Sequence, residues 1–324
     1  MPRDPRAFTQ PWRLIEVTTV TSQNRYLLRP SAEFNDLVIG VMARAQRKYG
    51  MQVICLTVLS THFHILVYTR DAKKLASFMC YVKTNIAKEV GGLHDWPGGI
   101  FESRYHHVEV SDEEADQIAR LKYCLANGVK ELLIDRVEEW PGNQSATALM
   151  AGESLKGHWY NRTRQNAVSR GKEEQVDVDE MKFASEERLV FSPLPCWAHL
   201  PEAEYRRRVA ELVDQINDEG ARERKRSKRT SEGPKKILHR DPHHRPKKVK
   251  RSPRPRFHAK DHWVWKRMWE AWREIVSAFR QASARLLAGE KDIEFQFPEG
   301  TFPPHLPFVP FIDAMSIEAR GQPV

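Results

Sequence analysis

Over the first 130 residues, the spacing of apolar positions alternates between that of strands and that of helices, and this pattern constrains the fold most strongly. Short β-branched and apolar runs predict strands at 14–21, 53–59, 62–68 and 104–110. Ser31 and Asp71 are placed to cap two amphipathic helices, and Ser111 with Glu114 predicts the start of a third, which Gly128 would end.

The predicted order is β-α-β-β-α-β followed by a helix. It indicates an α+β protein with a ferredoxin-like βαββαβ antiparallel sheet, both crossover helices lying on one face. The opposite face is left free for a site. A mostly helical, basic C-terminal region should follow.

The chain divides into four parts. Residues 10–150 carry the pattern above, 151–220 form an irregular and helical connector, 221–260 a basic Pro-containing segment expected to be disordered, and 261–324 an amphipathic helix and C-terminal tail. Within the tail, a short strand is predicted at 293–297.

Positive charge is concentrated in the third part. Residues 221–260 hold 17 Lys or Arg and three acids, whereas the net charge of the whole chain is +9. Such a density favours a polyanionic partner, and nucleic acid is the usual one. Its Lys225, Arg226, Lys228, Arg229, Lys247 and Lys248 are candidate phosphate contacts, although a solvated linker is the plainer alternative.

The cysteine spacing and the apolar runs of the sequence predict the compartment of the protein. Cys55, Cys80, Cys124 and Cys196 are far apart and form no C-x-x-C pair, which favours a reducing compartment. No signal-peptide core and no apolar run of membrane-spanning length is present. We therefore expect a cytoplasmic, nucleoid-associated protein with no membrane partner.

His62-Phe63-His64 is the first motif with chemical content. Residues i and i+2 of a strand share a face, so two imidazoles could grip one divalent ion while Phe63 packs on the other side. Because the pattern is short and common, two ordinary histidines on a half-exposed strand are the plainer alternative.

The third helix adds a phenol and an amide. At 100° per residue Ile118, Leu121 and Leu125 form an apolar stripe, whereas Tyr123 and Asn127 project from the polar side. A tyrosine hydroxyl is a weak nucleophile near its ordinary pKa of about 10. A divalent ion could polarise a phosphodiester for its attack, and a mixed nitrogen and oxygen ligand set suits Mg²⁺ or Mn²⁺.

The runs LSTHFHILVYTRD, FESRYHHVEV and LKYCLANGVKELLIDRVEEWPGNQS resemble the REP-associated tyrosine transposases, a branch of the single-tyrosine HUH (His-apolar-His) transposases. The resemblance covers about residues 10–150. It implies that Tyr123 is the nucleophile and that His62, His64 and Asn127 are metal ligands. It also implies cleavage and rejoining of single-stranded or hairpin DNA through a 5′-phosphotyrosine link, and a homodimer.

Two positions depart from that family's pattern. Thr61 replaces the Asn that usually precedes the histidines, and Gly128 replaces the Pro of a usual N-P-V, which leaves the ligation by Asn127 least secure. Arg104, His106 and His107 precede the third helix and are further candidate DNA contacts, or plain surface residues. Tyr81 and Asn85 repeat the Y-x-x-x-N spacing, but we interpret them as packing residues of the second helix.

Three functions are compatible with these residues. The first is a metal-dependent single-strand DNA endonuclease and strand-transferase. The second is a non-enzymatic nucleic-acid-binding protein that retains the fold. The third is a zinc hydrolase that uses His62 and His64 without Tyr123.

Overall fold

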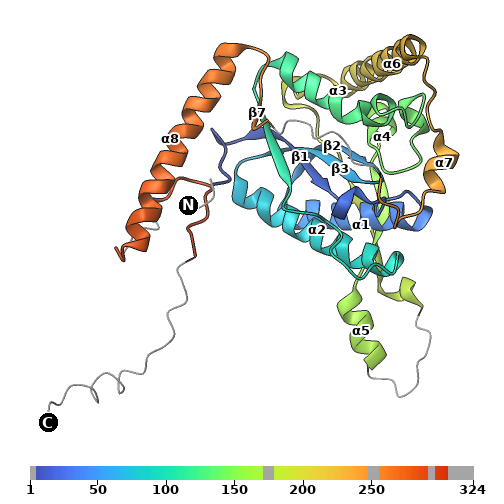
Figure 1. Cartoon of the computed structure of the whole chain (residues 1–324), viewed down its shortest axis with the longest axis horizontal. Helices are drawn as coiled ribbons and strands as arrows, with labels where there is room; N and C mark the ends of the chain where they lie inside the picture. Colours follow the sequence, from blue (N-terminus) through green and yellow to red (C-terminus); the bar gives the residue numbers. More distant parts are fainter. Residues whose placement is uncertain (1–4, 171–178, 247–254, 291–295, 306–324) are drawn as a thin grey trace.

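A five-stranded sheet with the strand order β2-β3-β1-β4-β7 lies at the centre of the molecule (Figure 1). The computed structural model describes residues 5–170, 179–246, 255–290 and 296–305. The strands of this sheet are β1 (Arg13–Val20), β2 (Gln52–Val58), β3 (His62–Thr69), β4 (His106–Val110) and β7 (Phe257–His258). The first four pair antiparallel, whereas β7 runs parallel to β4.

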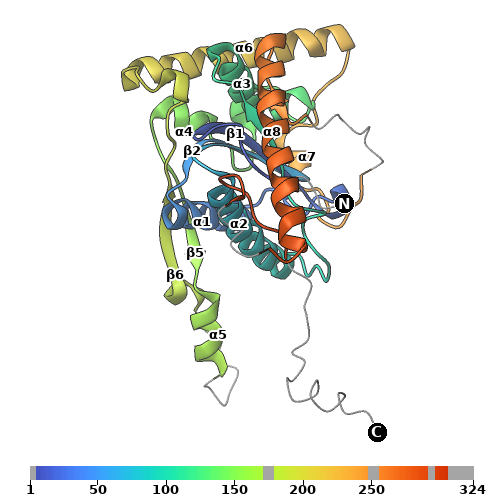
Figure 2. The same cartoon turned by 90° about the vertical axis from the view of Figure 1, so that its left-hand side faces the viewer.

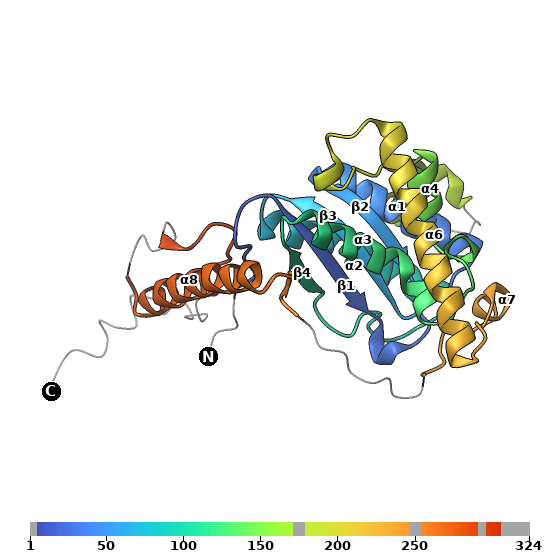
Figure 3. The same ribbon diagram turned by 90° about the horizontal axis from the view of Figure 1, so that it is seen from above.

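The crossover helices α1 (Ala32–Tyr49) and α2 (Ala72–Leu93) pack on one face of the sheet (Figure 3). Both begin where the sequence predicts, because the Ser31 and Asp71 side chains accept hydrogen bonds from Phe34 N and Lys74 N. The α+β class and the βαββαβ order of elements are confirmed. β7 was not predicted, since two residues from a distant segment carry no strand signal of their own.

The other face is covered by α3 (Glu114–Lys130) and α6 (Glu202–Ser227) (Figure 3). The predicted capping box is absent: Glu113 is the N-cap without a side-chain bond, and Ser111 Oγ donates to Asp116 Oδ2 at 2.5 Å. Gly128 does not end α3. A Cβ there would lie 2.8 Å from Ile134 Cδ1. The glycine therefore lets Ile134, in the loop after α3, pack closely against the helix.

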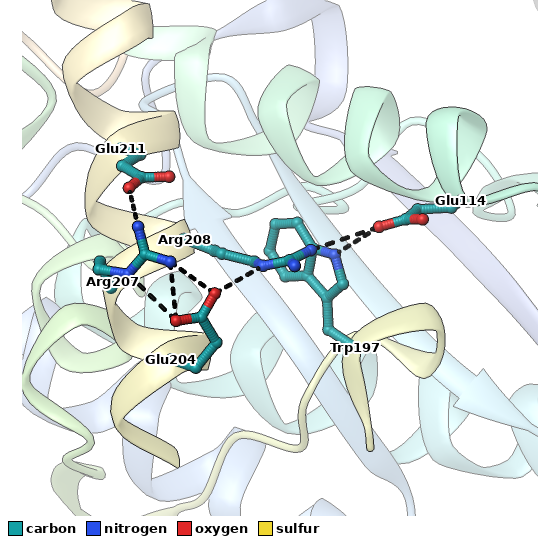
Figure 4. Close-up of polar contacts among 6 residues, drawn as sticks. All are labelled: Glu114, Trp197, Glu204, Arg207, Arg208 and Glu211. Atoms are coloured by element: carbon teal, nitrogen blue, oxygen red, sulfur yellow. Dashed lines mark hydrogen bonds and ion pairs between the residues drawn. The ribbon is translucent and has the colours of Figure 1, made fainter. Parts of the chain in front are cut away.

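Polar contacts fix α6 and the preceding turn against the start of α3 (Figure 4). Trp197 Nε1 donates to Glu114 Oε1 at 3.0 Å, and Arg208 forms an ion pair with the same carboxylate at 3.5 Å. Glu204 in turn accepts hydrogen bonds from Arg207 and Arg208. The helix that carries Tyr123 is therefore held between the sheet and a second helical layer.

The connector contains more regular structure than the sequence predicts. A hairpin of β5 and β6 extends from α1 and ends near α5 (Figure 2). The connector holds β5 (Leu155–Tyr160), α5 (Arg162–Arg170), β6 (Ala184–Leu189) and 3-10 turns at Glu180–Phe183 and Pro195–Trp197. Before it come α4 (Ala146–Ala151) and 3-10 turns at Ser22–Asn24 and Val137–Glu139. Glu187 of β6 pairs with Arg44 and Arg47 of α1, which ties the hairpin to the core.

Two glycines make this contact possible. A Cβ on Gly40 would lie 1.9 Å from the carbonyl oxygen of His158, and a Cβ on Gly157 would lie 2.1 Å from that of Asp36. Both collisions are with backbone, which cannot move aside as a flexible side chain can.

We therefore expect Gly40→Ala to destabilise the protein by about 1–3 kcal/mol, because α1 must separate from β5. Urea unfolding followed by circular dichroism measures this change. Gly92→Ala is the matched control, since that helical glycine has open space around its Cα. Equal stability of the two variants would contradict the proposed close contact.

The basic segment is partly built into the fold. Its first residues continue α6 to Ser227, and Ile237 of α7 (Pro234–Leu238) is fully buried in the core beside α3. The expectation of a disordered segment therefore does not hold for residues 221–246. Residues 247–254 and much of the strand predicted at 293–297 lie outside the described residues.

The amphipathic helix α8 (His262–Leu287) lies to one side of the sheet and is joined to it through β7 (Figures 1 and 2). Its buried residues Met268, Trp272 and Val276 cluster with Phe257 of β7. Within the described ranges, no helix has the length and apolar character needed to cross a membrane.

Candidate active site

The histidine pair lies at the start of β3, and its ring centroids are 5.0 Å apart. Phe63 between them is buried in the opposite core, as the strand period requires. The Thr61 hydroxyl lies 2.8 Å from Nδ1 of His62, so the threonine that departs from the family pattern still contacts this ring. Burial, and then the neighbouring His64, lower the pKa of His62 to about 3, which keeps the ring neutral at physiological pH.

A carboxylate that the sequence analysis missed orients His64. Glu16 of β1 places Oε1 2.7 Å from Nδ1 of His64, and its Oε2 accepts a hydrogen bond from Arg120 at 2.6 Å. Because an ionised carboxylate only accepts, Nδ1 of His64 carries a proton, and Nε2 is the ring nitrogen left to face a ligand. Burial opposes ionisation of Glu16, but His64 and Arg120 outweigh it and lower its pKa.

Tyr123 lies across from this pair on α3. Its ring meets that of His64 edge to face, with centroids 5.6 Å apart. The Thr57 hydroxyl of β2 donates to the carbonyl of Cys124 at 2.9 Å, which fixes α3 one residue from the phenol. The structure therefore brings Tyr123 of α3 next to the two histidines of β3.

Two cations flank the Tyr123 ring. Arg120 lies 5.1 Å and Lys130 4.8 Å from its centroid. Burial, and then the negative charge of Glu16, raise the pKa of Tyr123 above its usual value. The phenol is therefore protonated at neutral pH, and an attack by its oxygen requires removal of that proton.

Asn127 lies one helical turn beyond Tyr123 and is buried. Its Nδ2 donates to the carbonyls of Tyr123 and Cys124 at 2.9 and 3.2 Å. These bonds occupy only the amide nitrogen, so Oδ1 is the atom that could serve as a ligand.

The orientation of α3 explains the polar stripe in its sequence. Asp116, Arg120 and Asn127 are buried, whereas Ile118 of the predicted apolar stripe is only half-buried. The prediction that Ile118 belongs to the core is therefore wrong in part. The polar residues are covered because the helix turns them toward the polar centre of the sheet, where Glu16 receives Arg120.

The side chains around Tyr123 include possible ligands for a divalent cation. Among the described residues, no group of three His, Cys, Asp or Glu side chains is arranged to hold a metal. The candidate set is instead two imidazoles and one amide oxygen, with Glu16 behind His64 in the position of an outer-shell carboxylate. Nitrogen and oxygen donors of these kinds suit a divalent ion that keeps open positions for phosphate and water.

The three candidate DNA contacts around β4, which are Arg104, His106 and His107, do not lie together. Thr18 is opposite both His64 and His106, so His106 lies on the face of the site, where its Nε2 contacts the Pro255 carbonyl at 3.1 Å. His107 alternates to the other face, beside Phe8, and burial followed by Arg256 lowers its pKa to about 3. Arg104 is exposed in the turn before β4.

Four candidate phosphate contacts from residues 221–260 lie at the end of α6. Lys225, Arg226, Lys228 and Arg229 are all exposed, and Arg226 forms an ion pair with Glu223. Arg224 and Gly220 of this helix contact the C-terminal part of α3 and the loop after it. Positive charge is therefore held near the end of the helix that carries Tyr123. Lys247 and Lys248 lie outside the described residues.

Tyr81, which repeats the Y-x-x-x-N spacing, is a packing residue on α2. Its ring meets that of Tyr49 at 6.0 Å and contacts the core on the face opposite the histidines. Asn85 donates to the carbonyl of Tyr81 at 2.8 Å. The interpretation of this pair as structural is confirmed.

Comparison with solved structures finds partial matches of low sequence identity. A REP-associated tyrosine transposase bound to a REP hairpin is 14% identical and matches 56% of this chain and 96% of its own, with a TM-score of 0.37. A protein of Deinococcus radiodurans R1 assigned as a transposase is 16% identical and matches 34% of this chain and 87% of its own, with a TM-score of 0.27. No family model matches the sequence, and no curated protein matches it.

Proposed function

We propose that this protein is a metal-dependent single-strand DNA endonuclease and strand-transferase that uses Tyr123 as its nucleophile. The observation that carries the proposal is the 5.6 Å contact between the rings of Tyr123 and His64, with His62 a further 5.0 Å along the strand. A phenol beside a pair of imidazoles can serve as a nucleophile next to a metal site, which supports this proposal.

In the proposed reaction, Tyr123 Oη attacks the phosphorus of a single-stranded phosphodiester. A bond from Oη to phosphorus forms, the bond from phosphorus to the 3′-oxygen breaks, and the leaving oxygen takes up a proton to become a 3′-hydroxyl. The phenol proton passes to solvent. Arg120 and Lys130 lie over the ring, and their positive charges favour the phenolate once the proton has left. Attack by a 3′-hydroxyl on the phosphotyrosine reverses the sequence and joins strands.

His62, His64 and Asn127 would hold a Mg²⁺ or Mn²⁺ ion. Such an ion, when bound, would polarise the scissile phosphate and offset its charge. Glu16 keeps the His64 ring in the tautomer and orientation that present Nε2. The basic end of α6 would attract the DNA backbone by counterion release.

Purified protein incubated with labelled single-stranded DNA and Mn²⁺ tests this function. A protein–DNA adduct that survives denaturation supports it, and no adduct over many sequences and metals would leave a non-enzymatic DNA-binding protein. Hydrolysis with tightly bound zinc and no dependence on Tyr123 would instead indicate a zinc hydrolase.

The metal ligands can be tested without DNA. We expect His64→Ala to weaken Mn²⁺ binding by at least about 100-fold, measured by electron paramagnetic resonance, because an inner ligand is lost. His158→Ala is the matched control, since that histidine also pairs with a carboxylate, Asp36, at 2.9 Å but lies by α1. Unchanged affinity in His64→Ala would place the ion elsewhere.

A further inference from the structure

Four side chains at the start of α8 form an aromatic and basic surface, which we call the α8 cluster: His262, Trp263, Trp265 and Lys266. Trp263 is 69% exposed and Trp265 is 38% exposed. The ring of His262 stacks with that of Trp265 at 6.1 Å and an interplanar angle of 20°, and Lys266 Nζ lies 5.4 Å from the Trp263 centroid.

Core packing does not account for this cluster. The apolar face of α8 is already used by Met268, Trp272 and Val276, which bury themselves against Phe257. Trp263 lies on the opposite side of α8 from that contact. The ring of Trp265 packs on Trp269 next to the contact, with centroids 5.6 Å apart, and still leaves the residue 38% exposed. Large aromatic side chains left on a surface in a group indicate a binding site.

The position of the cluster relative to α3 is fixed. β7 is paired with β4, and the backbone N–H of Lys260 donates to Asp116 Oδ1 at 3.0 Å. Asp116 precedes Tyr123 by seven residues, or about 10 Å along the helix axis. Figure 1 shows the N-terminal end of α8 beside the beginning of α3, where this bond is made.

Charge at the same end of α8 fits a polyanion. Lys260, Lys266 and Arg267 are exposed there. Asp261 is used as the helix cap, where it accepts the N–H groups of Trp263 and Val264, while Glu270 lies 3.9 Å from Lys266. The local balance remains positive. Aromatic rings interleaved with cations are the usual means of binding unpaired bases.

We propose that the α8 cluster is a stacking platform for unpaired bases of single-stranded DNA. The identity of this strand as the one that reaches Tyr123 rests on the proposed function, whereas stacking itself does not. Trp263 and Trp265 are two positions apart and face different sides of the helix, so each offers its ring to a separate base. Lys266, beside Trp263, faces the phosphate backbone.

The test uses the full chain carrying Tyr123→Phe, so that no covalent link forms. Affinity for a fluorescent oligothymidine and for a blunt duplex of the same length is measured at low and high salt. We expect Trp263→Ala with Trp265→Ala to weaken oligothymidine binding by about 10- to 100-fold and to leave duplex binding unchanged. The loss should persist at high salt, because stacking releases no counterions.

Two further variants provide controls. Trp263→Phe with Trp265→Phe retains aromatic faces and should keep most of the affinity. Phe302→Ala removes an aromatic that is 52% exposed and has Lys73 5.7 Å from its ring, but packs by α2 on the other face, and should change nothing.

Three results would contradict the stacking platform: unchanged oligothymidine affinity in the double alanine variant, an equal loss of duplex affinity, or loss of a dimer with unchanged affinity per chain.

The stacking platform and the proposed nuclease can be refuted separately. An adduct in the parent protein together with unaltered binding by the double variant would refute only the platform. Selective loss of oligothymidine binding, with no adduct formed by the Tyr123 protein, would refute only the nuclease.

Discussion

Replacing Tyr123 by phenylalanine is expected to reduce formation of the covalent protein–DNA adduct by at least about 1,000-fold, because the substitution removes the attacking oxygen and little else. The ring can keep its contacts with His64, Arg120 and Lys130. DNA affinity and the free energy of unfolding should therefore stay close to those of the parent. The measurement is denaturing electrophoresis of labelled single-stranded DNA after incubation with Mn²⁺.

The chain supplies its own control for this experiment. Tyr81 has the same spacing to an asparagine, Asn85, but lies on α2 against Tyr49 on the far face of the sheet. Tyr81→Phe should form the adduct at the parent rate. If Tyr123→Phe still forms an adduct, or if Tyr81→Phe loses it, the nucleophile has been assigned to the wrong helix.

Local signals account for what the sequence predicted correctly. Ser31 and Asp71 act through hydrogen bonds within three residues, and Gly50 ends α1 with a φ of 56°, so each can be recognised from its neighbours. The two-residue period of β3 likewise places His62 and His64 on one face without knowledge of any partner strand.

The features that the sequence did not reveal depend on distant contacts. Glu16 becomes a partner of His64 only when β1 pairs with β3, 48 positions away in the chain. A single acid within the apolar run RLIEVTTV was the available signal. The polar stripe of α3 is buried because the helix turns it toward the sheet, where Glu16 receives Arg120. The packing of Ile237 into the core beside α3 likewise cannot be read from the basic composition around it.

Glu16→Gln is expected to have the largest effect on stability. Removing one partner of a buried ion pair costs about 3–5 kcal/mol, because the other charge remains buried, and here Arg120 would be left beside a neutral amide. The amide also cannot favour the Nδ1-protonated tautomer of His64 as strongly as a carboxylate. Urea unfolding should therefore show a lower stability, and adduct formation should fall about 10- to 100-fold.

Glu109→Gln separates these two effects. Glu109 is another buried carboxylate, and it pairs with Arg13 at 3.0 Å, but it lies opposite Ile15 and so on the other face of the sheet. This variant should lose stability while forming the adduct normally. Equal loss of adduct in both variants would show that Glu16 acts only through general stability.

The dependence on pH gives an independent check on the role of Glu16. Its pKa in the folded protein lies below the ordinary value of 4.5, so the native state binds fewer protons than the unfolded chain as the pH falls through this range. The stabilisation by Glu16 is therefore complete well above pH 4.5 and is lost as the pH falls through the lower folded value. The difference in unfolding free energy between parent and Glu16→Gln should be constant near neutrality and shrink below about pH 4.5. A constant difference down to pH 3 would mean that Glu16 is not held ionised by His64 and Arg120.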